Sequence, residues 1–246
     1  MKRKIIPMSF AECEVLERPF GWKVEYWDGQ AHLTPREVGI TTRIDLVPRS
    51  LRTHHELIPV HPAYTEQMIA GYLEVFTDSV EFCDWPSAQI QDSAEKCIAH
   101  YFAGKRGEAL SASVIALEPN SQNLAGLALF ILKREKQPHL DLLYVRHSFQ
   151  RRGIATAMVT WGINGLSKPN FSALFSTYHI CNEESRLWHH HFGFQDIYDP
   201  YVLRLKSSWL TQEIWRKEKL GLFEGLDALI TERDHCQSQL KPEDRY

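Results

Sequence analysis

Residues 140–163 constrain the fold of this chain more than any other segment, because they predict a strand, a turn and a helix in immediate succession. Residues 140–145 are apolar and β-rich, whereas 146–148 are polar and cannot extend that pattern. A helical spacing of apolar residues then runs over 154–163. A helix that begins at a turn presents unpaired N–H groups and the positive end of its dipole. The segment therefore predicts an anion-binding helix start.

The residues of the turn favour a phosphate as the anion. Gly153 and the small Ala155 let a phosphate come close to the backbone, where a larger side chain would collide. Arg151 and Arg152 add positive charge at the same place. The alternative is an ordinary strand-to-helix connection that needs one glycine for its turn.

Two motifs together favour a phosphate-binding turn over an ordinary strand-to-helix connection. The pattern Gln150-x-x-Gly153-x-Ala155 resembles the acetyl-CoA signature of the GNAT superfamily of N-acetyltransferases, which is usually written Gln/Arg-x-x-Gly-x-Gly/Ala. A second pattern, Asn182-x-x-Ser185 followed by Phe192-Gly193-Phe194, resembles a later helix and strand entry of the same family. Both occur in the family's order and spacing, and the resemblance covers residues 57–206.

The periodicity of the chain predicts a fold of the same kind. Strands are expected at 57–60, 112–117, 124–132, 139–145, 172–180, 194–198 and 201–205, and helices at 64–75, 87–101, 154–163 and 182–191. Three consecutive strands predict an antiparallel meander, and the helix at 154–163 allows the next strand to run parallel. We therefore expect an α/β (α+β) fold with a GNAT-like mixed, mostly antiparallel central sheet flanked by helices.

Segments on both sides of this core are expected to form extensions. Asp28-Gly29 between residues 22–27 and 30–34 predicts a two-residue hairpin, and a further strand at 40–47 ends at Pro48. We assign residues 1–52 to an N-terminal β-hairpin extension, 53–207 to the acetyltransferase domain and 208–246 to a C-terminal helical extension. The apolar stripe in 222–230 must be covered either by the domain or by a second subunit, so a homodimer through either extension stays open.

Composition excludes several classes of function. The net charge of −3 gives no field that would attract nucleic acid or an anionic membrane. No apolar run is long enough for a membrane span, and the basic N-terminus lacks the apolar core of a signal peptide. The five cysteines are scattered and form no C-x-x-C pair, which is typical of a cytosolic protein. We therefore expect a cytoplasmic protein.

The resemblance implies acetyl-CoA as co-substrate and assigns residues to it. Its pyrophosphate would be bound by backbone amides of the turn, its pantetheine arm would pair with the central strand, and the Val145 amide would polarise the thioester carbonyl. The implied set comprises Leu143, Tyr144, Val145, Gln150, Arg151, Arg152, Gly153, Ile154, Ala155, Asn182 and Ser185.

The groups that would move protons depart from the family pattern. His139 stands where the family often has a glutamate base, and Asp141 follows on the same face of the strand. His189 stands where the family usually has a tyrosine acid; Tyr144 and Tyr178 are weaker substitutes. The alternatives are that His139 and Asp141 merely finish a strand and that the thiolate leaves into water. No metal is expected, because consecutive histidines on a helix point about 100° apart.

The leading hypothesis is an N-acetyltransferase that transfers acetyl from acetyl-CoA to a primary amine by direct attack. The acceptor, a small-molecule amine or a peptide, cannot be identified from sequence. In the family, the two helices after the first strand form one wall of the acceptor site. The alternative is a non-catalytic acyl-CoA-binding regulatory or interaction module with the same fold, and a longer acyl donor is a third option.

Overall fold

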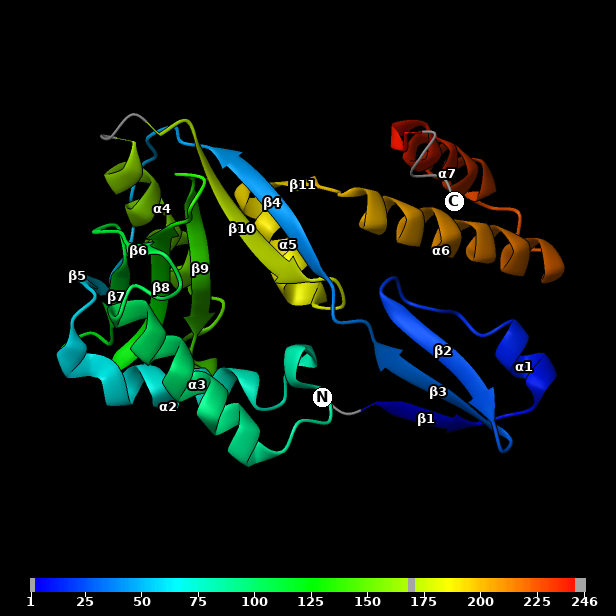
Figure 1. The fold of residues 1–246 in the computed structure, drawn as a ribbon, viewed down its shortest axis with the longest axis horizontal. Helices are drawn as coiled ribbons and strands as arrows, with labels where there is room; N and C mark the ends of the chain where they lie inside the picture. The colour runs from blue at the N-terminus through cyan, green and yellow to red at the C-terminus, as the bar shows by residue number, and fades with distance from the viewer. Residues whose placement is uncertain (1–2, 168–170, 242–246) are drawn as a thin grey trace.

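A central eight-stranded sheet organises the computed structural model, which describes residues 3–167 and 171–241 (Figure 1). Its strands are β4 (Gly39–Asp45), β5 (Glu56–Pro59), β6 (Glu108–Ala109), β7 (Val114–Leu117), β8 (Leu124–Leu132), β9 (Pro138–Val145), β10 (Ala173–His179) and β11 (Gln195–Ile197). They lie in the order β11-β4-β10-β9-β8-β7-β5, with β6 beside β8. Among these described strands only β9 and β10 pair in parallel, which confirms the predicted mixed, mostly antiparallel sheet.

Helices cover both faces of this sheet. Helices α2 (Thr65–Phe76) and α3 (Ser87–Phe102) lie on one face, and α4 (Ile154–Leu166) and α5 (Glu183–Phe192) lie on the other. Successive side chains of β8 alternate between the two layers, so Leu129 packs towards α2 and α3 whereas Phe130 packs towards α4. Two buried cores therefore fix the helices on either side of the strands.

The prediction of a strand at 201–205 is wrong, because these residues belong to the first turns of the long helix α6 (Pro200–Lys219). The Asp199 carboxylate accepts a hydrogen bond from the Val202 amide at 2.8 Å, and Pro200 occupies the first turn, where its missing N–H costs nothing. Leu203 and Leu210, seven residues apart and therefore on the same face of the helix, are both buried. The capping signal thus prevails over the β propensity of the residues that follow it.

The strand predicted at 40–47 exists as β4, but it belongs to the central sheet and not to the N-terminal extension. It pairs antiparallel with β10 over the whole length of both strands, from Ala173↔Asp45 to His179↔Gly39, and with β11 on its other side. β4 thereby occupies the place beside β10 on the side away from β9. The expected boundary at residue 52 falls after a strand of the core.

The N-terminal extension is a separate three-stranded sheet of β1 (Lys4–Pro7), β2 (Trp22–Trp27) and β3 (Gln30–Pro35), with α1 (Phe10–Glu14) beside it. The predicted hairpin is confirmed: Asp28 and Gly29 have φ of 51° and 70°, as a type I′ turn requires. The Trp209 indole of α6 donates to the Arg18 carbonyl at 2.6 Å, so this sheet rests on the C-terminal helices. Helix α7 (Leu226–Gln239) packs along α6.

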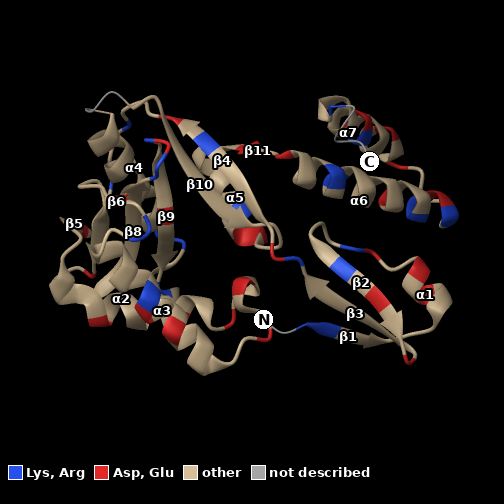
Figure 2. Cartoon of the chain, viewed as in Figure 1, with Lys and Arg blue, Asp and Glu red and all other residues tan. Residues whose placement is uncertain are grey.

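Charged residues of both signs lie on helices such as α3 and α6, whereas α4, β7, β8 and β10 contain no Lys, Arg, Asp or Glu (Figure 2). Among the helices that the structure describes, none is both long enough and apolar enough to cross a membrane.

Candidate active site

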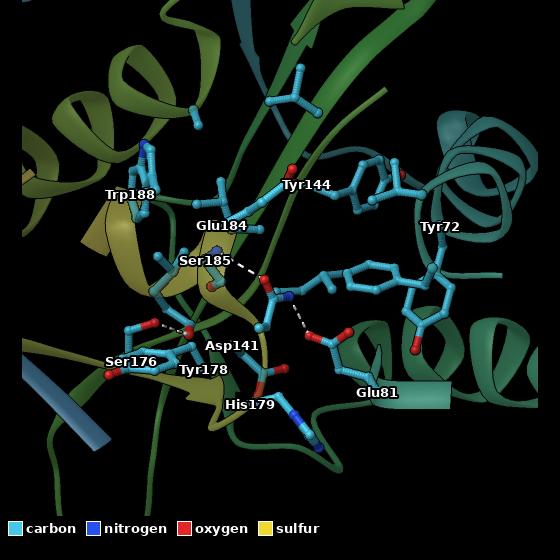
Figure 3. A pocket seen from close by; sticks show the side chains of 18 of the residues that line it. Tyr72, Glu81, Asp141, Tyr144, Ser176, Tyr178, His179, Glu184, Ser185 and Trp188 are labelled. Atoms are coloured by element: carbon cyan, nitrogen blue, oxygen red, sulfur yellow. Dashed lines mark hydrogen bonds between the residues drawn. The ribbon is translucent and has the colours of Figure 1, made fainter. Parts of the chain in front are cut away.

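A cavity of about 1120 Å³ lies between the helices α2 and α3 on one side and β9, β10, α4 and α5 on the other. Tyr72 of α2 and Trp188 of α5 mark its opposite walls in Figure 3. From the residues predicted as site residues, it is lined by Asp141, Leu143, Tyr144, Val145, Gln150, Arg151, Gly153, Ile154, Ala155, Asn182, Ser185 and His189. His139 and Arg152 do not line it; the Arg152 guanidinium lies over the Phe149 ring.

The floor of the cavity is a gap between the two parallel strands. β9 and β10 pair only at Phe175↔His139 and Ser176↔Leu140, and from there to Val145 the edge of β9 has no partner on β10 among the described residues. The register between β8 and β9 also shifts here, so that Asp141 lies opposite no residue of β8. Backbone groups of β9 are thereby left free to pair with an extended ligand.

The turn between β9 and α4 has the properties of an anion site. Gly153 has a φ of 77°, and a Cβ built on it would meet no atom within 4 Å, so the space in front of it is open. In the described residues, the amides from Arg151 to Thr156 find no backbone acceptor. These donors and the helix dipole all favour a negative group at this point.

Two side chains, Gln150 and Glu74, hold this turn in place through hydrogen bonds. The Gln150 side-chain amide donates to the Val145 carbonyl at 3.0 Å, which ties the turn to the end of β9. On α2, the Glu74 carboxylate accepts from the Arg146 guanidinium at 2.6 Å and from the His147 amide at 2.9 Å. Sequence reasoning missed Glu74, because nothing in the motif indicates a partner on a helix 72 residues away.

Asn182 joins the two walls. Its side-chain oxygen accepts from the Ser185 amide at 2.9 Å and caps α5, and its side-chain nitrogen donates to the Glu81 carboxylate at 2.6 Å (Figure 3). Glu81 belongs to a short 3-10 helix, Val80–Phe82, in the connection between α2 and α3. The second motif therefore positions the wall opposite to its own helix, and Glu81 is another residue that sequence reasoning missed.

Asp141 is part of an ion pair and not a free carboxylate. The Arg106 guanidinium, from the loop after α3, donates through Nε and through Nη2 to its two oxygens, the second at 3.1 Å. This hydrogen bonding raises the pKa of Arg106. Because both of its oxygens are engaged by the guanidinium, Asp141 is not the free carboxylate that a base in the cavity requires.

His139 is buried beside the cavity. Its Nδ1 donates to the Leu140 carbonyl at 3.2 Å, and its Nε2 lies 3.5 Å from the Thr177 hydroxyl. Burial, reinforced by the charge of Lys133, lowers the pKa of His139 from 6.5 to about 4. The imidazole is therefore neutral at physiological pH, and it does not line the cavity in which the substrates would bind.

The burial of His139 predicts a pH-dependent stability. Because the unfolded chain binds this proton with a pKa of 6.5 and the folded chain with a pKa of about 4, stability is complete above pH 6.5 and is lost as the pH falls towards 4. This group alone should lower the free energy of unfolding by about 2 kcal/mol between pH 8 and pH 5. Urea unfolding over that range should show a shallower loss for His139→Gln than for the wild type, and equal slopes would contradict the assignment.

His189 is buried with both ring nitrogens engaged. Nδ1 lies 2.7 Å from the Ser185 carbonyl, and Nε2 lies 2.9 Å from the Ser176 hydroxyl. Burial lowers the pKa of His189. The two candidate tyrosines point their hydroxyls elsewhere: Tyr144 donates to the Met68 carbonyl at 2.7 Å and Tyr178 donates to Asp196 at 3.0 Å.

A family model described as "Acetyltransferase (GNAT) family" matches residues 78–194. These residues of the chain belong to the GNAT acetyltransferase family. The match begins in the connection that carries Glu81 and ends at Phe194. It includes both motifs, β6 to β10 of the sheet and the cavity lining apart from Tyr72, Val75 and Phe76 of α2.

Solved structures with a similar fold include a GCN5-related N-acetyltransferase from Sphaerobacter thermophilus, with 14% identity, a TM-score of 0.46 and coverage of 65% of this chain and 48% of that one. The chain thus spans about half the length of the Sphaerobacter protein. Another is the PaiA N-acetyltransferase from Thermoplasma acidophilum in complex with coenzyme A, with 14% identity, a TM-score of 0.48 and coverage of 58% and 91%. A search of the curated proteins found no match.

Proposed function

We propose that this GNAT protein transfers the acetyl group of acetyl-CoA to a primary amine by direct attack of the amine on the thioester. The observation that carries the proposal is the continuity of the cavity, which joins the anion-binding turn at Gly153 to the unpaired edge of β9. A ligand with a pyrophosphate at one end and an extended amide arm at the other matches both features.

The donor would be held mostly by backbone. The amides from Arg151 to Ala155 would bind the pyrophosphate, and Arg151 and Arg152 would add charge near it. The arm would lie along β9 from Val145 towards Asp141. This puts the thioester near the closed end of the gap, so that an amide near Asp141, in place of the Val145 amide expected from the sequence, would polarise its carbonyl. Asn182 and Ser185 would then shape the opposite side of the groove.

The acceptor would enter from the side of α2 and α3. This wall is aromatic: the Phe82 ring lies 5.0 Å from Trp85 and 6.4 Å from Phe76. All three side chains line the cavity. Such a wall suits a small amine or a peptide end with an apolar body next to its amino group.

A second candidate is a non-catalytic acyl-CoA-binding module. It is supported by the state of the three predicted proton-transfer groups, since Asp141 is paired with Arg106, His139 does not line the cavity and His189 is buried. This candidate keeps the binding site and has no turnover.

Titration calorimetry with acetyl-CoA, followed by thiol release in the presence of amines, separates these functions. The panel should contain an alkylamine, an arylethylamine, a polyamine, an aminoglycoside and short peptides. Binding with thiol release supports the enzyme, binding without release supports the module, and absence of binding overturns both. Butyryl- and octanoyl-CoA in the same assay test for a longer acyl donor.

A further inference from the structure

Ser176 and His189 form a hydrogen-bonded pair at the closed end of the gap between β9 and β10. Ser176 is the last residue of β10 that pairs with β9, opposite Leu140, and its side chain lies on the cavity wall near Ser185 and Tyr178 (Figure 3). The Ser176 hydroxyl lies 2.9 Å from His189 Nε2. Both residues are buried, with 3% and 4% of their surface exposed.

The backbone defines the tautomer of this histidine. A carbonyl oxygen can only accept, so the contact of 2.7 Å between Nδ1 and the Ser185 carbonyl requires the proton to be on Nδ1. Nε2 is then an acceptor. The Ser176 hydroxyl lies 3.4 Å from the Leu140 carbonyl but only 2.9 Å from Nε2, and it donates to the nearer nitrogen. In the resting protein, His189 can therefore receive a proton through Ser176 but has none to give on that side.

We propose that Ser176 is a catalytic residue that relays protons between the reacting atoms and His189, so that one pair acts first as base and then as acid. The inference rests on the proposed acetyl transfer. It replaces the direct protonation of the thiolate by His189 that the sequence suggested, because His189 Nε2 is engaged by the hydroxyl of Ser176, a cavity-lining residue at the end of the β9–β10 pairing.

The relay transfers one proton from the amine to the thiolate and leaves Ser176 and His189 in their starting states. Attack of the neutral amine forms the C–N bond and gives a tetrahedral intermediate with an ammonium and an oxyanion. The ammonium proton passes to the Ser176 oxygen while the hydroxyl proton passes to His189 Nε2, and the Ser185 carbonyl stabilises the imidazolium through Nδ1. When the C–S bond breaks, the thiolate takes a proton from Ser176, which recovers its own from Nε2.

The groups around His189 are consistent with a transient charge. Asp196 favours the imidazolium, and His190, which contacts Asp196 at 3.0 Å, opposes it. The rings of Tyr178, Trp188 and Phe194 enclose the imidazole at 5.4, 5.0 and 5.1 Å. Burial keeps the pKa of His189 low, so the proton is held only briefly before it returns.

The test is a double-mutant cycle with Ser176→Ala and His189→Gln, measured as thiol release with the most active amine of the panel. Each single variant should lose about 100-fold in kcat, the lower end of the effect of general acid–base catalysis, and the double variant should lose no more than either. Ser176→Thr keeps the hydroxyl and should recover most of the activity. Acetyl-CoA affinity should stay within about twofold in all variants.

Thr42→Val is the matched control. Its hydroxyl is fully buried on β4 and lies 3.4 Å from the Ser176 carbonyl, on the side of β10 away from β9. The variant removes a buried hydroxyl from the same part of the sheet without touching the cavity, so its kcat should stay near that of the wild type.

Three results with the variants, and one with the wild-type protein, would overturn the relay. Near-normal kcat in Ser176→Ala shows that the hydroxyl is not used, and losses that multiply in the double variant show that the two residues do not act as a unit. An equal loss in Thr42→Val points to a structural role. Failure of the wild-type protein to bind acetyl-CoA refutes the proposed function itself, whereas binding without any thiol release refutes the relay and leaves the non-catalytic module.

Discussion

Gly153→Glu should lower the affinity for acetyl-CoA by about 1,000-fold or more. The introduced carboxylate would point into the open space in front of the turn, where no atom of the protein lies within 4 Å of the new Cβ. Two unit charges about 4 Å apart repel by about 4 kcal/mol near a protein surface, which corresponds to roughly 1,000-fold in a dissociation constant. Titration calorimetry with acetyl-CoA measures this directly, and near-normal affinity would refute the assigned pyrophosphate site.

The chain contains a closely matched control at Gly225. This glycine precedes α7 with φ 73° and ψ 8°, and Gly153 precedes α4 with φ 77° and ψ 6°. A Cβ on Gly225 would also meet nothing within 4 Å. Gly225→Glu should therefore cost the same left-handed strain, about 1–2 kcal/mol of stability, and leave acetyl-CoA binding unchanged. Equal loss of binding in both variants would indicate unfolding instead of repulsion.

Gly162→Ala should lower the free energy of unfolding by about 3 kcal/mol. Alanine usually stabilises a helix interior relative to glycine by about 0.5–1 kcal/mol. In α4, however, the new Cβ would lie 2.2 Å from Cζ of Phe130, a fully buried ring of β8. Either the ring or the helix must move, and the overpacking outweighs the gain in helix propensity. Chemical unfolding followed by circular dichroism gives the value.

Gly165→Ala is the control for this second prediction. It lies one turn further along α4, and its Cβ would be 3.6 Å from the Ala112 side chain, an ordinary contact. Stability should stay unchanged or rise by up to about 1 kcal/mol. If Gly162→Ala is equally harmless, the close approach between α4 and β8 is wrong. Since α4 carries the turn at Gly153, a helix displaced by Gly162→Ala should also bind acetyl-CoA more weakly.

Features that depend on neighbouring residues could be predicted from the sequence. The Asp28-Gly29 hairpin, the continuous apolar run of β8 and the Asn182 cap of α5 are each specified within a few residues, and the structure contains all three. The turn at Gly153 is of the same kind, because its conformation follows from one glycine between a strand and a helix. These signals located the floor of the cavity and the turn at its end that we propose to bind the pyrophosphate.

Features that depend on distant partners could not be predicted. The sequence around Asp141 contains no sign of Arg106, which lies 35 residues away and removes that carboxylate from the candidates for a free base. The pairing of Ser176 with His189 likewise requires β10 and α5 to be placed first. For α6, Asp199-Pro200 is a local signal for a helix start, whereas the β-forming Tyr201 and Val202 that follow it favour a strand.

The position of β4 has a consequence for how the protein is made. Residues 39–45 leave the ribosome early, yet their partners at 173–179 and 195–197 follow more than a hundred residues later. The backbone groups of β4 therefore stay unpaired until most of the chain has been synthesised. Contacts between residues so far apart in sequence also slow folding. β11 reaches the sheet only through β4. A fragment limited to residues 78–194 would therefore leave the outer edge of β10 open to association with other chains.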